Sequence, residues 1–200
     1  MGGPERPPEE TQDDRGLVEQ ARRGDREAFG TLVRRYQDRA FNLAYQMLRN
    51  REEALDIAQE AFARAYASLP TFKGESSFTT WLHRIVVNLA IDSLRRMRRS
   101  GTAAYDDTRA TPEEGEVDLP AADDPAAALE MKQVRGLLAR GIAELPPAQR
   151  AVLLLREVEG LSYEEISRAV GCNLGTVMSR LFYARRRLRH ALKVHLADLR

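Results

Sequence analysis

The sequence predicts an all-α protein of two small helical domains joined by a flexible acidic linker, and three observations lead to that prediction. Apolar residues recur at three- and four-residue steps through most of the chain, which is the spacing of one helix face, and no convincing pair of strand patterns occurs. Prolines and glycines interrupt these periodic stretches. Residues 100–124 show no periodicity and are rich in Ala, Asp, Glu, Thr and Pro, which is the composition of a linker.

The domain boundaries follow from these interruptions. Residues 1–16 lack the basic start and apolar core of a signal peptide and are expected to be a disordered lead. The two helical domains are expected over 17–99 and 125–195, with 100–124 as the tether. No apolar run approaches the length of a membrane span, and a single cysteine, Cys172, allows no intrachain disulfide, which suits a reducing cytosol.

The net charge of +1 hides a strong asymmetry along the chain. Residues 101–130 hold nine acidic residues and one basic residue, whereas 84–99 hold five arginines and one aspartate. Residues 151–200 hold nine basic and five acidic residues. Basic blocks separated by an acidic one indicate local electrostatic roles, and nucleic acid is the usual partner of such patches.

Three helices are expected in the first domain. Residues 25–49 and 51–68 each carry a helical apolar stripe, and Pro70 and Gly74 interrupt the pattern after them. Ser77 is placed to cap a third helix, which closes at the run RRMRR. The inner stripe expected for the second helix is Ala54, Leu55, Ala58, Ala61, Phe62 and Ala65. Opposite it, Asp56, Gln59, Glu60 and Ala63 form a polar stripe, which from spacing alone is an ordinary solvated face.

The loop and helix that follow carry the residue types that hold unstacked nucleic-acid bases. Phe72, Lys73, Ser76 and Ser77 lie in the loop, Trp81, His83, Arg84 and Asn88 follow on the helix, and Arg95, Arg96, Arg98 and Arg99 close it. Aromatic rings can stack on bases, hydroxyls and amides can bond to base edges, and arginines can hold phosphates. Phe78 and Trp81 also fit the core stripe, and we expect them to be mainly structural.

The second domain is expected to begin with two helices that prolines delimit. Asp124 and Pro125 supply an N-cap and a first-turn proline for a helix that runs to about Ala143. Pro146-Pro147 breaks it, and a further helix covers 148–160.

A short helix, a tight turn and a basic helix follow. Ser162 and Glu165 have capping-box spacing, Gly171 suits a left-handed turn, and Asn173 can cap the last helix. On that helix the residues expected to pack inward are Leu174, Val177, Leu181 and Leu188. Those expected to point outward are Thr176, Ser179, Arg180, Tyr183, Arg186 and Arg187, with Phe182 at the margin. This is the helix-turn-helix pattern, whose second helix fits the major groove of DNA. Helical hairpins are common, however, and the alternative is a bundle helix whose arginines are simply solvated.

Longer stretches resemble bacterial sigma factors of the extracytoplasmic-function type. They are YQDRAFNLAYQML, ALDIAQEAFARAYASLPTFKGESSFTTWLHRIVVNLAIDSLRR and LPPAQRAVLLLREVEGLSYEEISRAVGCNLGTVMSRLFYARRRL. The match covers about residues 17–99 and 126–195. It implies a region-two helical fold followed by a region-four helix-turn-helix domain.

The resemblance also implies site residues. Asp56, Gln59 and Glu60 would dock on the clamp helices of the RNA polymerase largest subunit. Phe72, Lys73, Ser76, Ser77, Arg84 and Asn88 would capture flipped bases of the minus-ten element, and Arg95, Arg96, Arg98 and Arg99 would hold the backbone beside it. Thr176, Ser179, Arg180, Phe182, Tyr183 and Arg186 would read the minus-thirty-five element. Met178 and Tyr183 stand where relatives often place arginine, which leaves the preferred upstream sequence open.

The partners implied by the family are core RNA polymerase, through its clamp helices and flap, promoter DNA as duplex and as melted strand, and an anti-sigma factor. The resemblance places the protein in the cytoplasm at the nucleoid, held at the inner membrane when such a partner resides there. We expect no metal site and no cofactor, because His83, His190, His195 and Cys172 lack partners at ligand spacing. We also expect no catalysis by this chain alone, because no pairing of a nucleophile with a base can be recognised in the sequence.

Two other functions are considered, and each predicts a different behaviour toward DNA. A stand-alone helix-turn-helix regulator with a sensor in its first half should bind duplex DNA tightly without polymerase. A helical adaptor that binds a protein and no DNA would tolerate the removal of Arg84 and Arg180 together. The resemblance in both halves argues against each.

Overall fold

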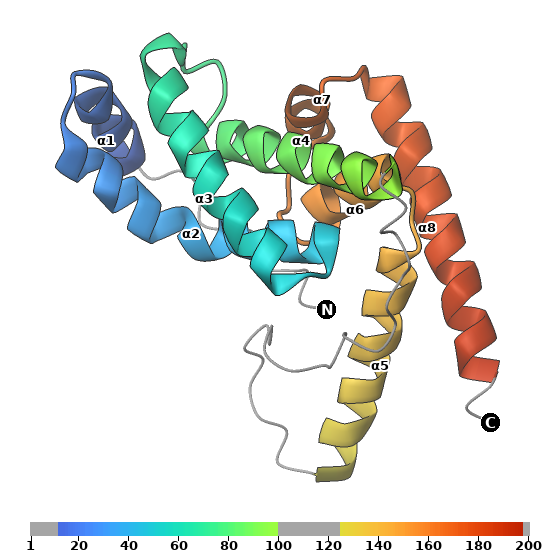
Figure 1. Ribbon diagram of the computed structural model, residues 1–200. Coiled ribbons are helices and arrows are strands. Elements are labelled where there is room, and N and C mark those ends of the chain that lie inside the picture. Colours follow the sequence, from blue (N-terminus) through green and yellow to red (C-terminus); the bar gives the residue numbers. More distant parts are fainter. Residues whose placement is uncertain (1–11, 100–124, 198–200) are drawn as a thin grey trace.

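The computed structural model describes residues 12–99 and 125–197, which form eight α-helices, one 3₁₀ turn and no strand (Figure 1). The elements are α1 (Gln12–Arg22), α2 (Arg26–Leu48), α3 (Arg51–Ser68), η1 (Leu69–Thr71), α4 (Phe78–Arg99), α5 (Pro125–Ala143), α6 (Pro147–Glu157), α7 (Tyr163–Val170) and α8 (Leu174–Ala197). The predicted all-α class is confirmed, and each helix expected from residue 25 onward is present within about three residues of its expected bounds.

Helix α1 corrects the predicted lead over 1–16, which is wrong from Gln12 onward. Asp14 is buried, and its carboxylate accepts a 2.6 Å hydrogen bond from the hydroxyl of Tyr36 and a further bond from Arg35. These contacts span 21 and 22 residues, so no local pattern reveals them. The predictions for residues 1–11 and for the linker over 100–124 fall outside the described residues.

The first half packs α2, α3 and α4 around one core. Its fully buried side chains include Leu32, Leu43 and Met47 of α2, Ala61 and Ala65 of α3, and Phe78, Leu82 and Val86 of α4. Asn50 caps α3 by accepting the Glu53 amide at 3.0 Å, and Ser77 caps α4 by accepting the Thr80 amide at 3.0 Å. The inward placement of Leu55 is wrong, because its side chain is 43% exposed, and Ile57 is buried instead.

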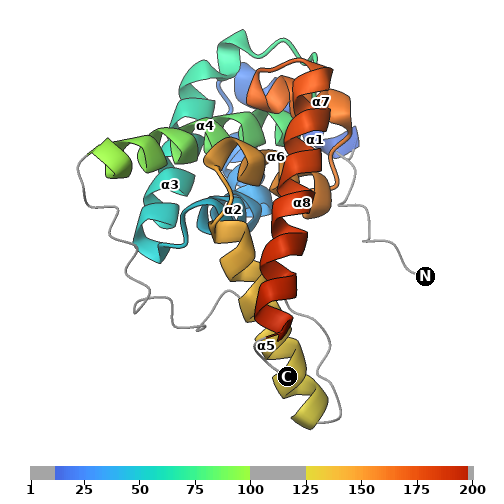
Figure 2. The same cartoon turned by 90° about the vertical axis from the view of Figure 1, so that its right-hand side faces the viewer.

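The second half packs α5, α6 and α7 against α8, and Ala151 to Leu155 of α6 are all buried. Helices α5 and α8 run side by side in both views (Figures 1 and 2). They approach closely at Gly141, where a Cβ atom would lie 2.7 Å from the Cδ1 of Leu188. The side chain of Leu174 is 42% exposed, which corrects its expected inward position, and Ala184 fills the face instead.

The two halves pack on each other, with α4 against α7 and α2 against α6 (Figure 2). Arg150 of α6 is buried at this seam and donates hydrogen bonds to the main-chain carbonyls of Met47, Ala143 and Leu145. One guanidinium therefore ties the end of α2 to the turn between α5 and α6. None of the described helices is long and apolar enough to cross a membrane.

Candidate nucleic-acid interface

The helix-turn-helix unit is built by local signals that the sequence displays. Ser162 Oγ accepts the Glu165 amide at 3.2 Å, and the Glu165 carboxylate accepts the Ser162 amide at 2.7 Å, so the predicted capping box is present. Gly171 ends α7 with φ of 63°, a left-handed conformation that glycine adopts without strain. Asn173 Oδ1 accepts the Thr176 amide at 2.8 Å and starts α8.

Helix α8 presents a mixed apolar and cationic outer face. Val177 and Leu181 anchor its inner side, while Ser179, Tyr183 and Arg186 are exposed as expected. Thr176 and Arg180 are half-buried, and Arg180 lies 3.6 Å from the sulfur of Cys172. Among the described large apolar side chains of α8, Met178 and Phe182 are the most exposed, at 56% and 62%. Sequence reasoning places Phe182 only at the margin of this face and assigns Leu174 to the core. Leu174 is instead exposed and is followed by Met178 and Phe182 at four-residue steps.

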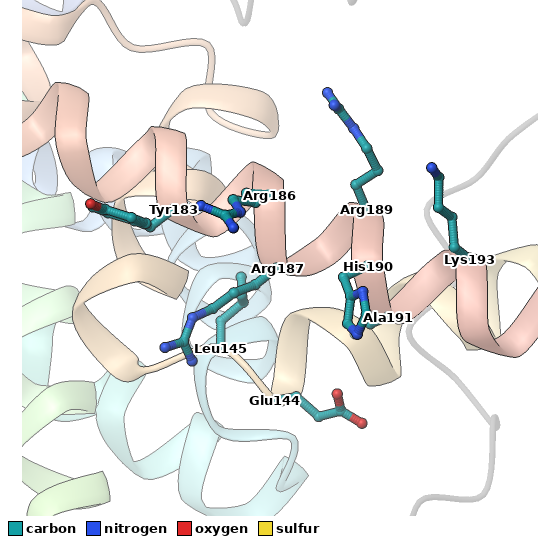
Figure 3. A pocket seen from close by; sticks show the side chains of 10 residues that line it. Glu144, Leu145, Tyr183, Arg186, Arg187, Arg189, His190, Ala191 and Lys193 are labelled. Carbon is teal, nitrogen blue, oxygen red and sulfur yellow. The ribbon is translucent and has the colours of Figure 1, made fainter.

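Arg185 and Arg187 of α8 have different surroundings. Arg185 donates to one oxygen of Glu157 in α6 at 2.6 and 3.0 Å, and this hydrogen bond raises the pKa of Arg185 above its ordinary value. Arg187 instead lines a groove between α5 and α8 with a volume of about 870 Å³ (Figure 3). Tyr183, Arg186, Arg189, His190 and Lys193 also line that groove, and Glu144 is its acidic residue. Helix α8 is therefore cationic well beyond the turn.

The loop over 72–77 holds its predicted residues in unequal positions. Lys73 is exposed and Ser76 is half-buried. The Ser77 hydroxyl is engaged in capping α4. It accepts a hydrogen bond from the Thr80 amide and donates one to the Thr80 hydroxyl at 2.9 Å. Phe72 is buried, with its ring centroid 4.7 Å from that of Trp81. Most of the Phe72 ring is therefore covered by the protein.

Beyond the loop, α4 carries the other predicted residues on its surface. Arg84 and Asn88 are exposed one turn apart, and Arg95, Arg96, Arg98 and Arg99 are exposed toward the end of the helix. Asp92 offsets part of this charge by pairing with Arg95 at 3.3 Å. Arg84 and Asn88 thus lie in the half of α4 that follows the loop, and the arginine cluster lies at the other end of the helix.

The stripe on α3 is a separate surface. Asp56, Gln59 and Glu60 are all exposed, and Glu60 pairs with Arg64 at 2.7 Å. The exposed Leu55 lies beside Asp56, so the surface is a mixed acidic and apolar patch. Sequence reasoning misses this apolar position on the surface by assigning Leu55 to the core.

Buried polar side chains join the two halves near these surfaces. The Nε2 of His83 in α4 lies 3.4 Å from the carboxylate of Glu159, which Arg39 of α2 approaches to 3.7 Å. Burial, with a further effect of the Arg39 charge, lowers the pKa of His83 to about 3. Burial raises the pKa of Glu159, and the Arg39 charge opposes that rise. His83 is therefore neutral at pH 7. Among the described residues no cluster of three His, Cys, Asp or Glu side chains could hold a metal ion.

Comparison with known proteins places both halves in one family. The chain matches the family models Sigma-70 region 2 over residues 32–100 and Sigma-70 region 4 over residues 135–188. It is 40% identical to the RNA polymerase sigma-H factor of Pseudomonas aeruginosa over 90% of this chain and 94% of that protein. It is 39% identical to the ECF RNA polymerase sigma-E factor of Escherichia coli K12 over 86% of this chain and 90% of that protein.

Two solved structures share the fold. One is CnrH in complex with the cytosolic domain of CnrY, with a TM-score of 0.64, 26% identity and coverage of 92% of this chain and 99% of that one. The other is the sigma factor RpoE in complex with the anti-sigma factor NepR from Bartonella quintana, with a TM-score of 0.59, 25% identity and coverage of 83% and 97%. Together with the helix-turn-helix geometry and the cationic faces of α4 and α8, these matches identify the chain as a transcription initiation factor of the extracytoplasmic-function sigma family.

Proposed function

We propose that the chain binds core RNA polymerase and directs it to promoters by reading two DNA elements, one as duplex and one as melted strand. The observation that carries this proposal is the presence, in one chain, of a helix-turn-helix with a cationic outer helix and of a separate exposed set of polar and cationic residues, Lys73 in the loop before α4 and Arg84 and Asn88 on α4. We further propose that the chain itself catalyses no reaction and acts in the cytoplasm.

The minus-thirty-five element is assigned to α8. Ser179 and Arg180 can bond to base edges in the major groove, Thr176 and Tyr183 flank them, and Arg186 can contact phosphate. Met178 and Phe182 offer apolar contacts, for which the methyl group of thymine is the partner in the major groove. The upstream element is therefore expected to contain thymine opposite these two side chains.

The minus-ten element is assigned to the loop and α4. Ser76 and Asn88 supply hydrogen-bonding groups for a base edge, and Lys73 and Arg84 supply charge for the phosphates beside it. Ser77 and Phe72 act indirectly, because Ser77 caps α4 and Phe72 anchors the loop on Trp81. The cluster Arg95, Arg96, Arg98 and Arg99 continues the phosphate track along α4.

Strand opening follows from differential binding. A site that takes an extruded base has affinity for the melted state and little for the closed duplex, so binding shifts the equilibrium toward the open state. The α3 patch of Leu55, Asp56, Gln59 and Glu60 is assigned to the clamp helices of polymerase, and α5–α8 to its flap. An anti-sigma factor is proposed as a further partner, because the relative RpoE is bound by NepR in its solved complex.

The test is transcription by reconstituted holoenzyme on genomic DNA fragments, with sequencing of transcript 5′ ends. Wild-type protein should select a defined set of starts that core polymerase alone does not select. Asn88→Ala and Arg180→Ala should abolish that selection while polymerase binding persists, whereas Asp56→Arg should abolish polymerase binding itself. Asn42→Ala and Asp38→Asn, at exposed positions of α2, are the matched controls. Tight duplex binding without polymerase, together with unaltered start choice, would favour a stand-alone regulator.

A further inference from the structure

A cavity of about 520 Å³ lies between the 72–77 loop and α1. The loop contributes Phe72, Glu75, Ser76 and Ser77 to its lining, α1 contributes Arg15, Glu19 and Arg22, and α7 contributes Arg168. Its volume falls in the range of roughly 300–1,000 Å³ that is usual for sites that hold small molecules. The loop proposed to capture a base is therefore only one wall of the cavity, and a helix that sequence reasoning treats partly as lead forms another.

Helix α1 is a fixed wall. Asp14 holds it to Tyr36 and Arg35 of α2, and Val18 and Ala21 are buried beneath it. Arg15, Glu19 and Arg22 follow one another at steps of four and three residues, so they share one helix face. Because the helix is anchored from its buried side, these three side chains keep their place along the cavity.

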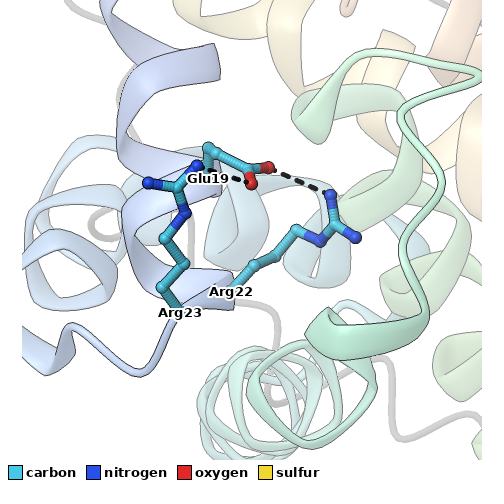
Figure 4. A network of polar contacts seen from close by, with 3 residues as sticks. All are labelled: Glu19, Arg22 and Arg23. Atoms are coloured by element: carbon cyan, nitrogen blue, oxygen red, sulfur yellow. Dashed lines mark hydrogen bonds and ion pairs between the residues drawn. The ribbon is translucent and has the colours of Figure 1, made fainter.

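The charges on this wall are arranged around one carboxylate. Glu19 pairs with Arg22 at 3.0 Å and with Arg23 at 3.4 Å, and the two arginines lie on either side of it (Figure 4). The side chain of Arg23 is 78% exposed and is not part of the cavity lining, whereas that of Arg22 is 38% exposed and lines the cavity. Exposed pairs of this kind are weak and exchange readily. Arg22 can therefore release Glu19 and turn to another anion.

We propose that α1 forms a second wall of the site for the melted promoter strand, and that Arg15 and Arg22 bind the phosphates on either side of a base held between α1 and the loop. This proposal rests on the function proposed above. A single strand needs a hydrogen-bonding and apolar lining for its base, which Ser76 and Val18 supply, and a cationic track for its backbone. The strand would then contact Arg15 and Arg22 of α1 in addition to Lys73 of the loop and Arg84 of α4.

The experiment measures the affinity of reconstituted holoenzyme for a fluorescent promoter whose minus-ten region is held open as a mismatched bubble, at several salt concentrations. The double variant Arg15→Gln/Arg22→Gln should bind about tenfold or more weakly. Its slope of log affinity against log salt should become shallower by about 0.7 for each phosphate of the single strand that the variant no longer neutralises. Arg23→Gln is the matched control, because Arg23 adjoins Arg22, pairs with the same Glu19 and faces away from the cavity. It should behave as wild type.

The outcomes separate this proposal from the one on which it rests. Equal binding by the double variant and wild type, or an equal weakening in Arg23→Gln, would overturn the role of α1. If Asn88→Ala also left bubble binding unchanged, strand capture by the loop would fail as well. Weaker binding with Asn88→Ala but not with the double variant would overturn only the α1 proposal. Circular dichroism checks the fold, and the single variants Arg15→Gln and Arg22→Gln replace the double variant if it unfolds.

Discussion

The imidazole Nε2 of His83 in α4 lies 3.4 Å from the carboxylate of Glu159, and both side chains are buried where the two halves meet. The Nδ1 of His83 is buried without a hydrogen-bond partner within the described part of the chain. Protonation would therefore place a charge and an unsatisfied donor in the interior. This accounts for the lowering of the His83 pKa from 6.5 to about 3, together with the nearby positive charge of Arg39.

The first prediction is that this histidine makes the folded state sensitive to acid. Unfolded chains take up a proton at His83 near pH 6.5, whereas the folded state does so only near pH 3. The contribution of His83 to stability is thus fully present above pH 6.5 and declines as the pH falls toward 3, by at most about 1.4 kcal/mol per pH unit. Glu159 has the opposite effect, because its raised pKa means that the folded state gains stability when that carboxyl is protonated.

His83→Gln should remove the histidine part of this acid sensitivity. Urea unfolding at pH 7.5, 6.5, 5.5 and 4.5 should show the free energy of unfolding falling less steeply in the variant than in the wild type. His190→Gln, at an exposed position on α8, should leave the wild-type pH profile unchanged. Identical profiles for His83→Gln and the wild type would show that His83 does not resist protonation in the folded state.

The second prediction concerns Arg150, whose guanidinium bonds to the carbonyls of Met47, Ala143 and Leu145. Arg150→Met keeps the apolar stem and removes all three bonds, which leaves buried carbonyl oxygens without this donor. The free energy of unfolding should fall by about 2–4 kcal/mol, since hydrogen bonds to charged groups are among the stronger ones. Arg135→Met, at an exposed position of α5, should change stability by about 0.5 kcal/mol or less. A similar small change for Arg150→Met would contradict a role in joining the halves.

How far the sequence predicts this fold depends on the range of the interactions. The capping box of Ser162 and Glu165 and the left-handed turn at Gly171 involve neighbours within a few residues, so their signals stand in the local sequence. Helix α1 is not predicted, because the hydrogen bond that holds Asp14 to Tyr36 joins residues far apart along the chain. A buried carboxylate of this kind cannot be told from a solvated one until its partner is known.

The candidate site shows a second limit. Helical spacing tells which residues share a face, but not how wide the buried face is. The pattern therefore places Leu55 and Leu174 in the core, although both are more than 40% exposed and lie on surfaces proposed to bind partners. The burial of Phe72 against Trp81 is likewise not visible in the local pattern, because it depends on the path of the loop.

The third prediction tests the anchoring of α1. Tyr36→Phe removes the 2.6 Å hydrogen bond to the buried carboxylate of Asp14 and should cost about 1.5–3 kcal/mol. The destabilisation should appear locally, as faster hydrogen exchange of the α1 amides than of the α3 amides. Tyr66→Phe, at a 42% exposed ring of α3, is the control and should leave exchange in α1 unchanged. Unchanged protection of α1 in Tyr36→Phe would mean that this hydrogen bond does not hold the helix.

The fourth prediction separates two glycines of the helix-turn-helix. Gly171 has φ of 63°, so Gly171→Ala forces a side chain into the left-handed region and should destabilise the second half by about 1 kcal/mol. Gly175 lies in the first turn of α8, and a Cβ there would meet only the Asn173 Oδ1 at 3.5 Å, an ordinary contact. Gly175→Ala should therefore be neutral or stabilising, since alanine favours helix over glycine by about 1 kcal/mol in a helix interior. Thermal unfolding of the two variants side by side should show opposite or clearly unequal shifts in Tm. Equal shifts would mean that backbone conformation at Gly171 does not limit the stability of the turn.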